Sequence, residues 1–276
     1  MFWQTTRFCI DLAEPKVMGI VNVTPDSFSD GGRHGDAAGA LAHCETLLAE
    51  GAHILDIGGE STRPGAAQVP LDEELRRVIP VVEGALKLGV PVSVDTVKPE
   101  VMRRALDAGA DIVNDINALR LPGALEAVAA HPGCGVCLMH MRGDPATMQQ
   151  RPAYDDVVLE VGDFLRERLA ALRERGVTAE RVVLDPGIGF GKSVQHNLDL
   201  LRRQRELLAL GRPLLLGWSR KSTLGALTGR PVEQRLAASV AAALACVHRG
   251  ARIVRVHDVA ATADALKVWG AAGLGG

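Results

Sequence analysis

Aromatic residues, net charge and long apolar runs are all scarce in this chain of 276 residues. Only 3% of its residues are aromatic, and its formal net charge is −2. A nearly neutral chain lacks the excess of basic residues that general nucleic-acid binding uses, so we expect small-molecule partners instead. The longest nearly uncharged apolar run, residues 236–247, is shorter than the roughly 20 residues of a transmembrane helix. We therefore expect no nucleic-acid partner and no membrane span.

Cysteines are also few and scattered. The five present are an odd set, which does not fit the disulfide framework of a small secreted domain. Cys134 and Cys137 have the C-x-x-C spacing of redox and zinc sites, but no second pair completes a zinc site. Cys137 also falls within an apolar strand pattern, so a structural role is favoured. Because no secretory signal is recognisable either, the sequence predicts a soluble cytoplasmic protein.

What the chain does contain is a regular alternation of strand-like and helix-like segments. Eight apolar runs of strand length cover residues 17–23, 53–57, 90–96, 111–116, 135–140, 181–185, 213–218 and 252–258. Helical spacing covers residues 72–88, 99–108, 155–175, 197–210 and 232–249.

This alternation implies parallel strand pairing, and eight units in about 250 residues match an α/β fold of the closed (β/α)8 TIM-barrel type. An open doubly wound sheet is the alternative, although no G-x-G-x-x-G follows the first strand. We expect a single domain over residues 1–276, with a leader at 1–16 that contains a hairpin at 8–12, and a flexible tail at 271–276.

Polar residues gather at the carboxyl end of each expected strand. They are Asn22, Asp56, Asp95, Asn114, Asp115, His140, Asp185, Ser219, Arg255 and His257. In a β/α barrel this end forms the face on which active sites are built. A buried amide such as that of Asn22 costs about 1–3 kcal/mol without a partner, so a neighbour or a ligand must satisfy it. The one-sided arrangement predicts a ligand site and favours an enzyme.

Two loops rich in glycine and polar residues follow the first two strands. Ser61, Thr62 and Arg63 in the second loop could hold an anion, although such residues are more often merely solvated. We expect residues 24–36 and 59–70 to be mobile without substrates.

The ends of the third, fourth and sixth strands can converge in the barrel mouth. There Asp95, Asn114 and Asp185 would complement a flat heterocycle edged with N–H groups, such as a 2-amino-4-oxopyrimidine, and a carboxylate network with backbone N–H groups is the alternative. Residues 185–193 lack the first glycine of a phosphate loop and the third glycine of a dinucleotide motif. We interpret this segment as a rigid loop that places Phe190 beside an aromatic substrate.

Two further motifs favour anion binding. Residues 217–222, Gly-Trp-Ser-Arg-Lys-Ser, place two cations and two hydroxyls at the expected start of a helix, where a carboxylate or phosphate is stabilised. Arg255 and His257 lie on one face of the last strand and could share an anion with Asn22.

Taken together, these segments resemble the dihydropteroate synthase family over residues 17–259. The most specific stretches are residues 18–32, 58–65, 93–96, 113–115, 139–141, 185–192, 219–222 and 255–258. The resemblance implies a transferase of folate biosynthesis that joins 6-hydroxymethyl-7,8-dihydropterin pyrophosphate to p-aminobenzoate. It also implies a dissociative reaction, in which pyrophosphate leaves before the arylamine attacks.

The resemblance assigns roles residue by residue. It implies that Asp95, Asn114, Asp185 and Lys221 hold the pterin, and that Asn22, Arg255 and His257 hold the pyrophosphate, with Asn22 also a ligand of Mg²⁺. It implies a p-aminobenzoate pocket lined by Phe28, Thr62, Arg63, Pro64, Phe190, Gly217 and Ser219, with Ser222 at the carboxylate. On this basis Asn22, Asp95, Asp185, Lys221, Arg255 and His257 are the expected catalytic residues. Ser193 and Val97 depart from the family pattern, but neither is an expected ligand residue.

Two other functions stay open at this point. A non-catalytic pterin-binding paralogue would keep every ligand residue, so the sequence does not separate it from an enzyme. A folate-dependent methyltransferase would share the barrel but would not need residues 62–64 or 219–222, which disfavours it. The apolar segment 236–247 predicts a helix that contacts the barrel on one side and a second subunit on the other, in a homodimer.

Overall fold

The computed structural model describes residues 1–24, 32–61, 68–144, 147–150 and 152–274, and for residues 32–36 it describes the backbone only. Its eight-stranded parallel sheet has the order β8-β7-β6-β5-β4-β3-β10-β9. The strands are β3 (Lys16–Asn22), β4 (Ile54–Gly58), β5 (Val92–Asp95), β6 (Ile112–Asp115), β7 (Gly135–Met139), β8 (Val182–Asp185), β9 (Leu215–Leu216) and β10 (Ile253–Val256). A parallel bridge between Leu184 and Leu214 joins the two outer strands. The predicted closed barrel is therefore confirmed.

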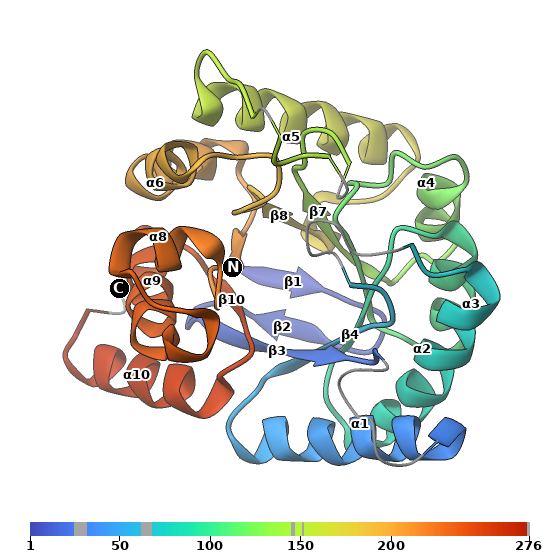
Figure 1. Cartoon of the computed structure of the whole chain (residues 1–276). Coiled ribbons are helices and arrows are strands. Elements are labelled where there is room, and N and C mark those ends of the chain that lie inside the picture. The colour runs from blue at the N-terminus through green and yellow to red at the C-terminus, as the bar shows by residue number, and fades with distance from the viewer. Residues whose placement is uncertain (25–31, 62–67, 145–146, 151, 275–276) are drawn as a thin grey trace.

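Helices surround the strands in a ring (Figure 1). They are α1 (Gly32–Ala49), α2 (Leu71–Ala85), α3 (Pro99–Ala108), α4 (Ala124–Ala129), α5 (Val157–Glu174), α6 (Val194–Arg202), α7 (Gln204–Leu207), α8 (Ser222–Thr228), α9 (Leu236–His248) and α10 (Val259–Ala271), with short 3₁₀ helices η1 (Leu86–Leu88), η2 (Ala179–Arg181), η3 (Leu208–Leu210) and η4 (Val232–Gln234). Among the helices of the described residues, none combines the length and apolarity that crossing a membrane requires.

The expected helix 197–210 is interrupted, because Arg203 leaves helical geometry with φ −103° and ψ 15°. The expected strand 213–218 is reduced to Leu215–Leu216, and Pro213, which has no N–H to donate to the sheet, lies outside it.

The barrel interior is layered, because alternate residues of a strand face the same side. The lower inward layer is apolar and consists of Met18, Ile54, Ile112, Cys137, Val183, Leu215 and Ile253. Two residues farther along the same strands, the inward positions are Ile20, Asp56, Asn114, Met139, Asp185, Gly217 and Arg255. The polar mouth thus follows from the strand period, with an apolar floor directly beneath it.

An antiparallel hairpin of β1 (Phe2–Gln4) and β2 (Cys9–Asp11) completes that floor. Trp3 and Leu12 are fully buried against the lower layer. The Trp3 indole donates to the carbonyl of Arg181 at 2.9 Å, just before β8 begins. The hairpin predicted over residues 8–12 therefore exists, but it begins at Phe2 and packs into the amino-terminal end of the barrel.

The cysteines have the structural role that was predicted. All five are free, and Cys134 and Cys137 are both buried. Cys137 lies in the apolar lower layer, and the Cys134 thiol lies 3.5 Å from the carbonyl of Val128.

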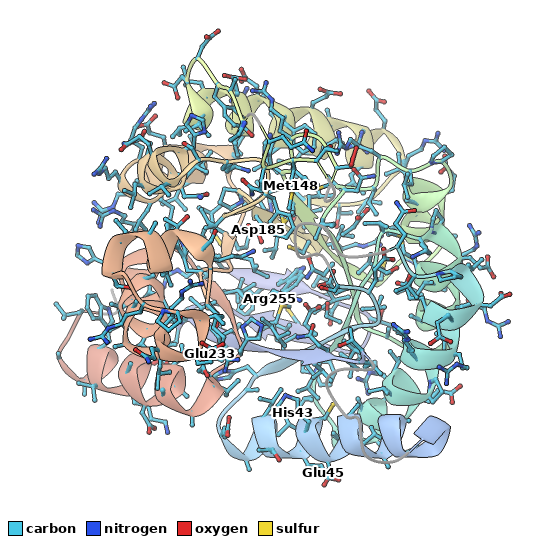
Figure 2. The ribbon with its side chains drawn as sticks, in the orientation of Figure 1. His43, Glu45, Met148, Asp185, Glu233 and Arg255 are labelled. Carbon is cyan, nitrogen blue, oxygen red and sulfur yellow. The ribbon has the colours of Figure 1, made fainter. Side chains whose placement is uncertain are left out.

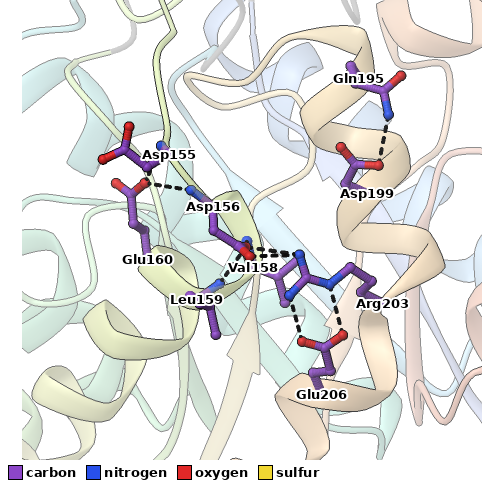
Figure 3. Close-up of polar contacts among 9 residues, drawn as sticks. All are labelled: Asp155, Asp156, Val158, Leu159, Glu160, Gln195, Asp199, Arg203 and Glu206. Atoms are coloured by element: carbon purple, nitrogen blue, oxygen red, sulfur yellow. Dashed lines mark hydrogen bonds and ion pairs between the residues drawn. The ribbon is translucent and has the colours of Figure 1, made fainter.

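Ion pairs connect the start of α5 with the start of α7 on the outside of the barrel (Figure 3). Asp156 caps α5 by accepting from the backbone of Val158 and Leu159. The same carboxylate receives Nη1 of Arg203, and the other side of that guanidinium contacts Glu206 at 2.8 Å. Surface pairs of this kind contribute about 0–1 kcal/mol each, so they fix the helix positions more than they stabilise the fold.

Candidate active site

Side chains from four strands meet in the carboxyl-terminal mouth of the barrel. Arg255 donates from Nε to Asp56 Oδ2 and from Nη2 to Asp95 Oδ2, each at 2.6 Å. Asn114 donates to the same Oδ2 of Asp56 at 3.0 Å. Figure 2 shows Asp185 and Arg255 near the centre of the ring of helices. The strand-end residues expected to converge are therefore in one place.

Asp56 joins two of the expected substrate residues. Its carboxylate is fully buried and receives both Arg255 and Asn114. Its second oxygen, Oδ1, has no partner among the described residues. Asp56 therefore orients both Arg255 and Asn114.

Burial controls the charge state of the mouth. Burial raises the pKa of Asp185 to about 6. The backbone N–H of Gly187, which donates to the carboxylate at 2.7 Å, acts in the opposite direction and lowers this pKa. Burial also raises the pKa of Asp95, with the Arg255 guanidinium opposing the shift. The pKa of Lys221 is lowered to about 8 by burial and by Arg255. Carboxylates in this environment are stabilised by any N–H donors that a ligand brings.

A flat aromatic surface lies beside these charges. The Lys221 ammonium is 4.2 Å from the centre of the Phe190 ring. This geometry is a cation–π contact between the loop after β8 and the residue that caps α8. Phe190 packs with the buried side chains of Ile116, Met139, Met141 and Met148. Phe190 therefore lies beside Lys221, another of the expected substrate residues.

The loop that carries Phe190 is held against the end of β7. Gly187 has φ +70°, and a Cβ there would lie 1.9 Å from the carbonyl oxygen of His140, so only glycine fits. Lys192 is buried beneath the loop and donates to the carbonyls of Gly187 and Phe190 at 2.9 and 3.0 Å. Its Nζ also lies 2.9 Å from Nδ1 of His140, a neutral ring because burial lowers its pKa to about 2. No pattern in the sequence indicates this role of Lys192.

Lys192→Met should remove a pH-dependent part of the stability. Burial lowers the pKa of Lys192 from 10.5 to about 7. A lysine whose pKa is lowered on folding adds stability that is fully present above pH 10.5 and is lost as the pH falls through 7. The wild type should therefore gain on the order of 2 kcal/mol over Lys192→Met between pH 7 and pH 9.5 in urea unfolding. The exposed Lys267→Met is the control, and an equal difference at both pH values would contradict the prediction.

His257 is oriented by Ser219 from the neighbouring strand end. The Ser219 hydroxyl oxygen accepts the backbone N–H of His257 at 3.1 Å and lies 3.0 Å from its Nδ1. The hydroxyl proton can then donate to Nδ1, which leaves Nε2 as the protonated nitrogen. Burial and Arg255 lower the pKa of His257 to about 3. We therefore expect a neutral hydrogen-bond donor at this position.

The remaining expected residues divide into two groups. Asn22 ends β3, the strand that pairs with β10, Gly217 lies beside Arg255, and Ser222 is the first residue of α8. Phe28, Thr62, Arg63 and Pro64 lie outside the described residues, as do residues 25–31 and 62–67 of the two loops expected to be mobile.

The base of the second loop has an anchor that the sequence did not predict. Glu74, fully buried on α2, accepts from the Thr96 hydroxyl at 2.6 Å. Lys98 pairs with both Glu74 and Glu60. Glu60 is thereby fixed immediately before Ser61.

Comparisons with known proteins agree with this geometry. Residues 18–257 match the family of pterin binding enzymes. The chain is 56% identical to a dihydropteroate synthase of Neisseria meningitidis serogroup B, over 99% of this chain and 98% of that protein.

Two similar solved structures are dihydropteroate synthases with a bound ligand. Dihydropteroate synthase of Xanthomonas albilineans with 4-aminobenzoic acid has a TM-score of 0.91 and 56% identity, covering 96% of this chain and 95% of that one. Dihydropteroate synthase of Burkholderia cenocepacia complexed with 7,8-dihydropteroate has a TM-score of 0.90 and 54% identity, covering 99% and 96%. This chain therefore belongs to the dihydropteroate synthase family of pterin binding enzymes.

Proposed function

We propose that this chain condenses 6-hydroxymethyl-7,8-dihydropterin pyrophosphate with p-aminobenzoate, giving 7,8-dihydropteroate and pyrophosphate. The observation that carries the proposal is the hydrogen-bonded set of Arg255, Asp56, Asp95 and Asn114, with Asp185 beside it, in a chain of this family. Three carboxylates, an amide and a guanidinium in one mouth suit a polar heterocycle that carries an anionic leaving group.

The pterin would occupy the mouth between the third, fourth and sixth strands of the barrel. Asp95 and Asp185 offer acceptors for its ring N–H groups, and Asn114 offers one amide end, since the other end is committed to Asp56. Lys221 offers a donor to the ring oxygen or nitrogen. Carboxylates that hydrogen-bond these N–H groups raise the electron density of the ring and so stabilise positive charge at the methylene group.

The pyrophosphate would lie toward β10 and β3. Arg255 donates one N–H from Nε and one from Nη2 to the two carboxylates. The second N–H of Nη2 and both N–H groups of Nη1 are left to bind a phosphate oxygen. Nε2 of the neutral His257 adds one donor, and the Asn22 amide adds another. These donors stabilise the negative charge that develops as the C–O bond to pyrophosphate breaks.

Mg²⁺ fits this site as an ion shared with the substrate. The Asn22 amide makes no hydrogen bond within the described part of the chain, so its oxygen is available to a cation. No group of three His, Cys, Asp or Glu that could hold a metal occurs among the described residues. Mg²⁺ is commonly bound by one or two protein oxygens together with phosphates, and it supplies charge neutralisation there.

The p-aminobenzoate would enter beside Phe190. The ring would pack on Phe190, near Ser219, with Phe28, Thr62, Arg63 and Pro64 as further lining residues. Ser222 at the start of α8 would meet the carboxylate. The amine nitrogen then bonds to the methylene carbon, and the amine loses one proton to complete the product.

We also propose that two chains form a homodimer through α9. One face of α9 is buried, through Ala242, Ala243, Cys246 and Val247, whereas Leu236 at its start is exposed. Leu227 of α8 and Val232 of η4, the elements just before α9, are exposed too. A second copy would cover these side chains and stabilise the pair by about 1.5–3 kcal/mol for each fully buried one.

Leu236→Glu should convert this dimer into a monomer. A charged side chain at 46% exposure is tolerated in the monomer but is costly in an apolar interface. We expect sedimentation at micromolar concentration to give a dimer for the wild type and a monomer for Leu236→Glu. Leu159→Glu on α5, where Leu159 is 58% exposed, is the matched control. A monomeric wild type would remove the proposal.

We propose the cytoplasm as the location. All five cysteines are free. Unpaired, buried thiols are typical of proteins in a reducing compartment.

The function is tested by following labelled p-aminobenzoate with the pterin pyrophosphate and Mg²⁺. Product formation that stops with a chelator supports the proposal. Binding of the pterin without product would identify a non-catalytic paralogue. Methyl transfer from a folate, without any use of p-aminobenzoate, would identify the methyltransferase alternative.

A further inference from the structure

Asn197 of α6 is a buried amide that joins two segments of the proposed site. Its side chain is 1% exposed. Oδ1 accepts from the backbone N–H of Gly189 at 2.9 Å, and Nδ2 donates to the hydroxyl of Thr223 at 2.9 Å. Gly189 directly precedes Phe190, and Thr223 directly follows Ser222. One side chain outside the mouth therefore bridges the Phe190 loop and the start of α8.

The bridge needs both ends of an amide. A backbone N–H can only donate, so Gly189 fixes Oδ1 toward the loop and leaves the amino group facing Thr223. An apolar side chain of equal size would supply neither bond. It would also deprive the half-buried Gly189 N–H and the buried Thr223 hydroxyl of these partners.

The two segments that the bridge joins are in direct contact. Gly189 has φ +81°, and a Cβ there would lie 3.2 Å from Cδ of Lys221, so the loop backbone passes close to the lysine stem. The Lys221 ammonium in turn lies over the Phe190 ring. A change in the separation of Gly189 and Thr223 would therefore move Phe190 relative to Lys221 and Ser222.

Neither segment needs Asn197 for its own conformation. Lys192 already holds the carbonyls of Gly187 and Phe190. The turn before α8 is closed by the Lys221 N–H to the carbonyl of Trp218 at 3.1 Å, and the start of α8 by the Leu224 N–H to the carbonyl of Lys221 at 3.0 Å. What the amide adds is the position of one segment relative to the other.

We propose that Asn197 is a positioning residue for the arylamine half of the reaction. It fixes the distance between the Phe190 loop and the start of α8, and thereby the width of the pocket that Phe190 and Ser222 form. The inference rests on the proposed function, because that function places p-aminobenzoate between these residues. The pterin contacts of Asp95, Asn114 and Asp185 lie outside the bridge, and only Lys221 among the expected pterin residues lies beside it. Pterin binding should therefore be affected less than p-aminobenzoate binding.

Three variants separate positioning from simple stabilisation. Thr223→Val removes the hydroxyl at equal size, Asn197→Leu removes both bonds, and Thr223→Ser keeps the hydroxyl. We expect the KM for p-aminobenzoate to rise roughly tenfold in Thr223→Val and Asn197→Leu. The Kd for the pterin pyrophosphate should change by less than this KM, because only Lys221 among its expected contacts lies beside the bridge, and Thr223→Ser should match the wild type. The variant that combines Asn197→Leu with Thr223→Val should have the same KM for p-aminobenzoate as Asn197→Leu alone, because the two changes break the same bridge.

Lower thermal stability with an unchanged KM in Thr223→Val would overturn the proposal, since a structural role alone changes only the folded fraction. Amide hydrogen exchange of the substrate-free protein gives a second readout. We expect faster exchange over residues 186–190 in Thr223→Val than in the wild type and Thr223→Ser. Equal exchange in all three would also overturn the proposal.

This design keeps the two proposals separate. If the wild type forms no dihydropteroate, the proposed function fails, and hydrogen exchange still decides whether the bridge holds the loop. If the wild type is active and Thr223→Val keeps its KM, the function stands and the positioning role fails.

Discussion

Arg255→Met is expected to lower kcat about 10³-fold, because one guanidinium neutralises two carboxylates of the mouth and, in the proposed function, would also face the leaving group. Arg255 contacts Asp56 and Asp95 at 2.6 Å in the free protein. Its loss leaves these carboxylates without a cation and removes the donors that pyrophosphate would use. Steady-state kinetics with both substrates measures the effect.

The same variant should lose stability in a pH-dependent way. Removing one partner of a buried ion pair costs about 3–5 kcal/mol. In Arg255→Met the pKa of Asp95, already raised by burial, should rise further. A carboxyl with a raised pKa stabilises the fold below its ordinary value of 3.8 and loses that contribution as the pH rises. The loss relative to wild type should therefore be larger at pH 8 than at pH 5.

Two controls isolate the effect of Arg255. Arg252→Gln removes a cation at the opposite end of the same strand, where Arg252 donates to the carbonyl of Ala13 at 3.0 Å, and should keep normal kinetics. Arg255→Lys keeps the charge but loses the two-pronged contact with the carboxylates, and should be intermediate. Near-normal kcat in a folded Arg255→Met protein would contradict the assignment.

Asp185→Asn is expected to weaken binding of the pterin pyrophosphate about 100-fold while leaving p-aminobenzoate binding nearly unchanged. The substitution keeps the size of the side chain but replaces one acceptor with an N–H₂ donor, which would face the N–H groups of the ring. A site built to hydrogen-bond a ligand loses heavily when one partner has the wrong polarity. Calorimetry with each ligand separately measures the two affinities.

The control for Asp185→Asn is Asp163→Asn on α5, where the exposed carboxylate pairs with Arg166. That change should leave both affinities as they are. If Asp185→Asn weakens both ligands equally, Asp185 supports the whole loop after β8 and does not bind the pterin selectively.

The sequence was sufficient to predict the barrel and the side of it on which the polar residues lie. The reason is the strand period, because Ile54 and Asp56, or Val183 and Asp185, lie two residues apart on the same inward face. The apolar member of each pair forms the floor and the polar member forms the mouth. A strand that begins apolar and ends polar therefore reveals its direction and its site.

Contacts across the barrel could not be predicted in the same way. Arg255 contacts Asp56 and Asp95 because the closed barrel brings their strands within reach of its side chain. No local sequence pattern predicts these contacts. Lys192 follows a glycine-rich loop, and its sequence neighbours include no evident partner. Its partner His140 lies on another strand end and is brought to it only by the fold. The predicted hairpin over residues 8–12 omits the strand that contains Trp3. A strand of three residues shows too little alternation of polar and apolar side chains to be recognised in the sequence.

The proposed function requires both substrates to meet in the polar mouth above the apolar floor. A crystal structure of the protein with 7,8-dihydropteroate would show whether they do. We expect the pterin ring within hydrogen-bond distance of Asp95, Asn114 and Asp185, with the aminobenzoate ring beside Phe190. Product bound elsewhere, or a pterin ring that contacts none of these three residues, would contradict it.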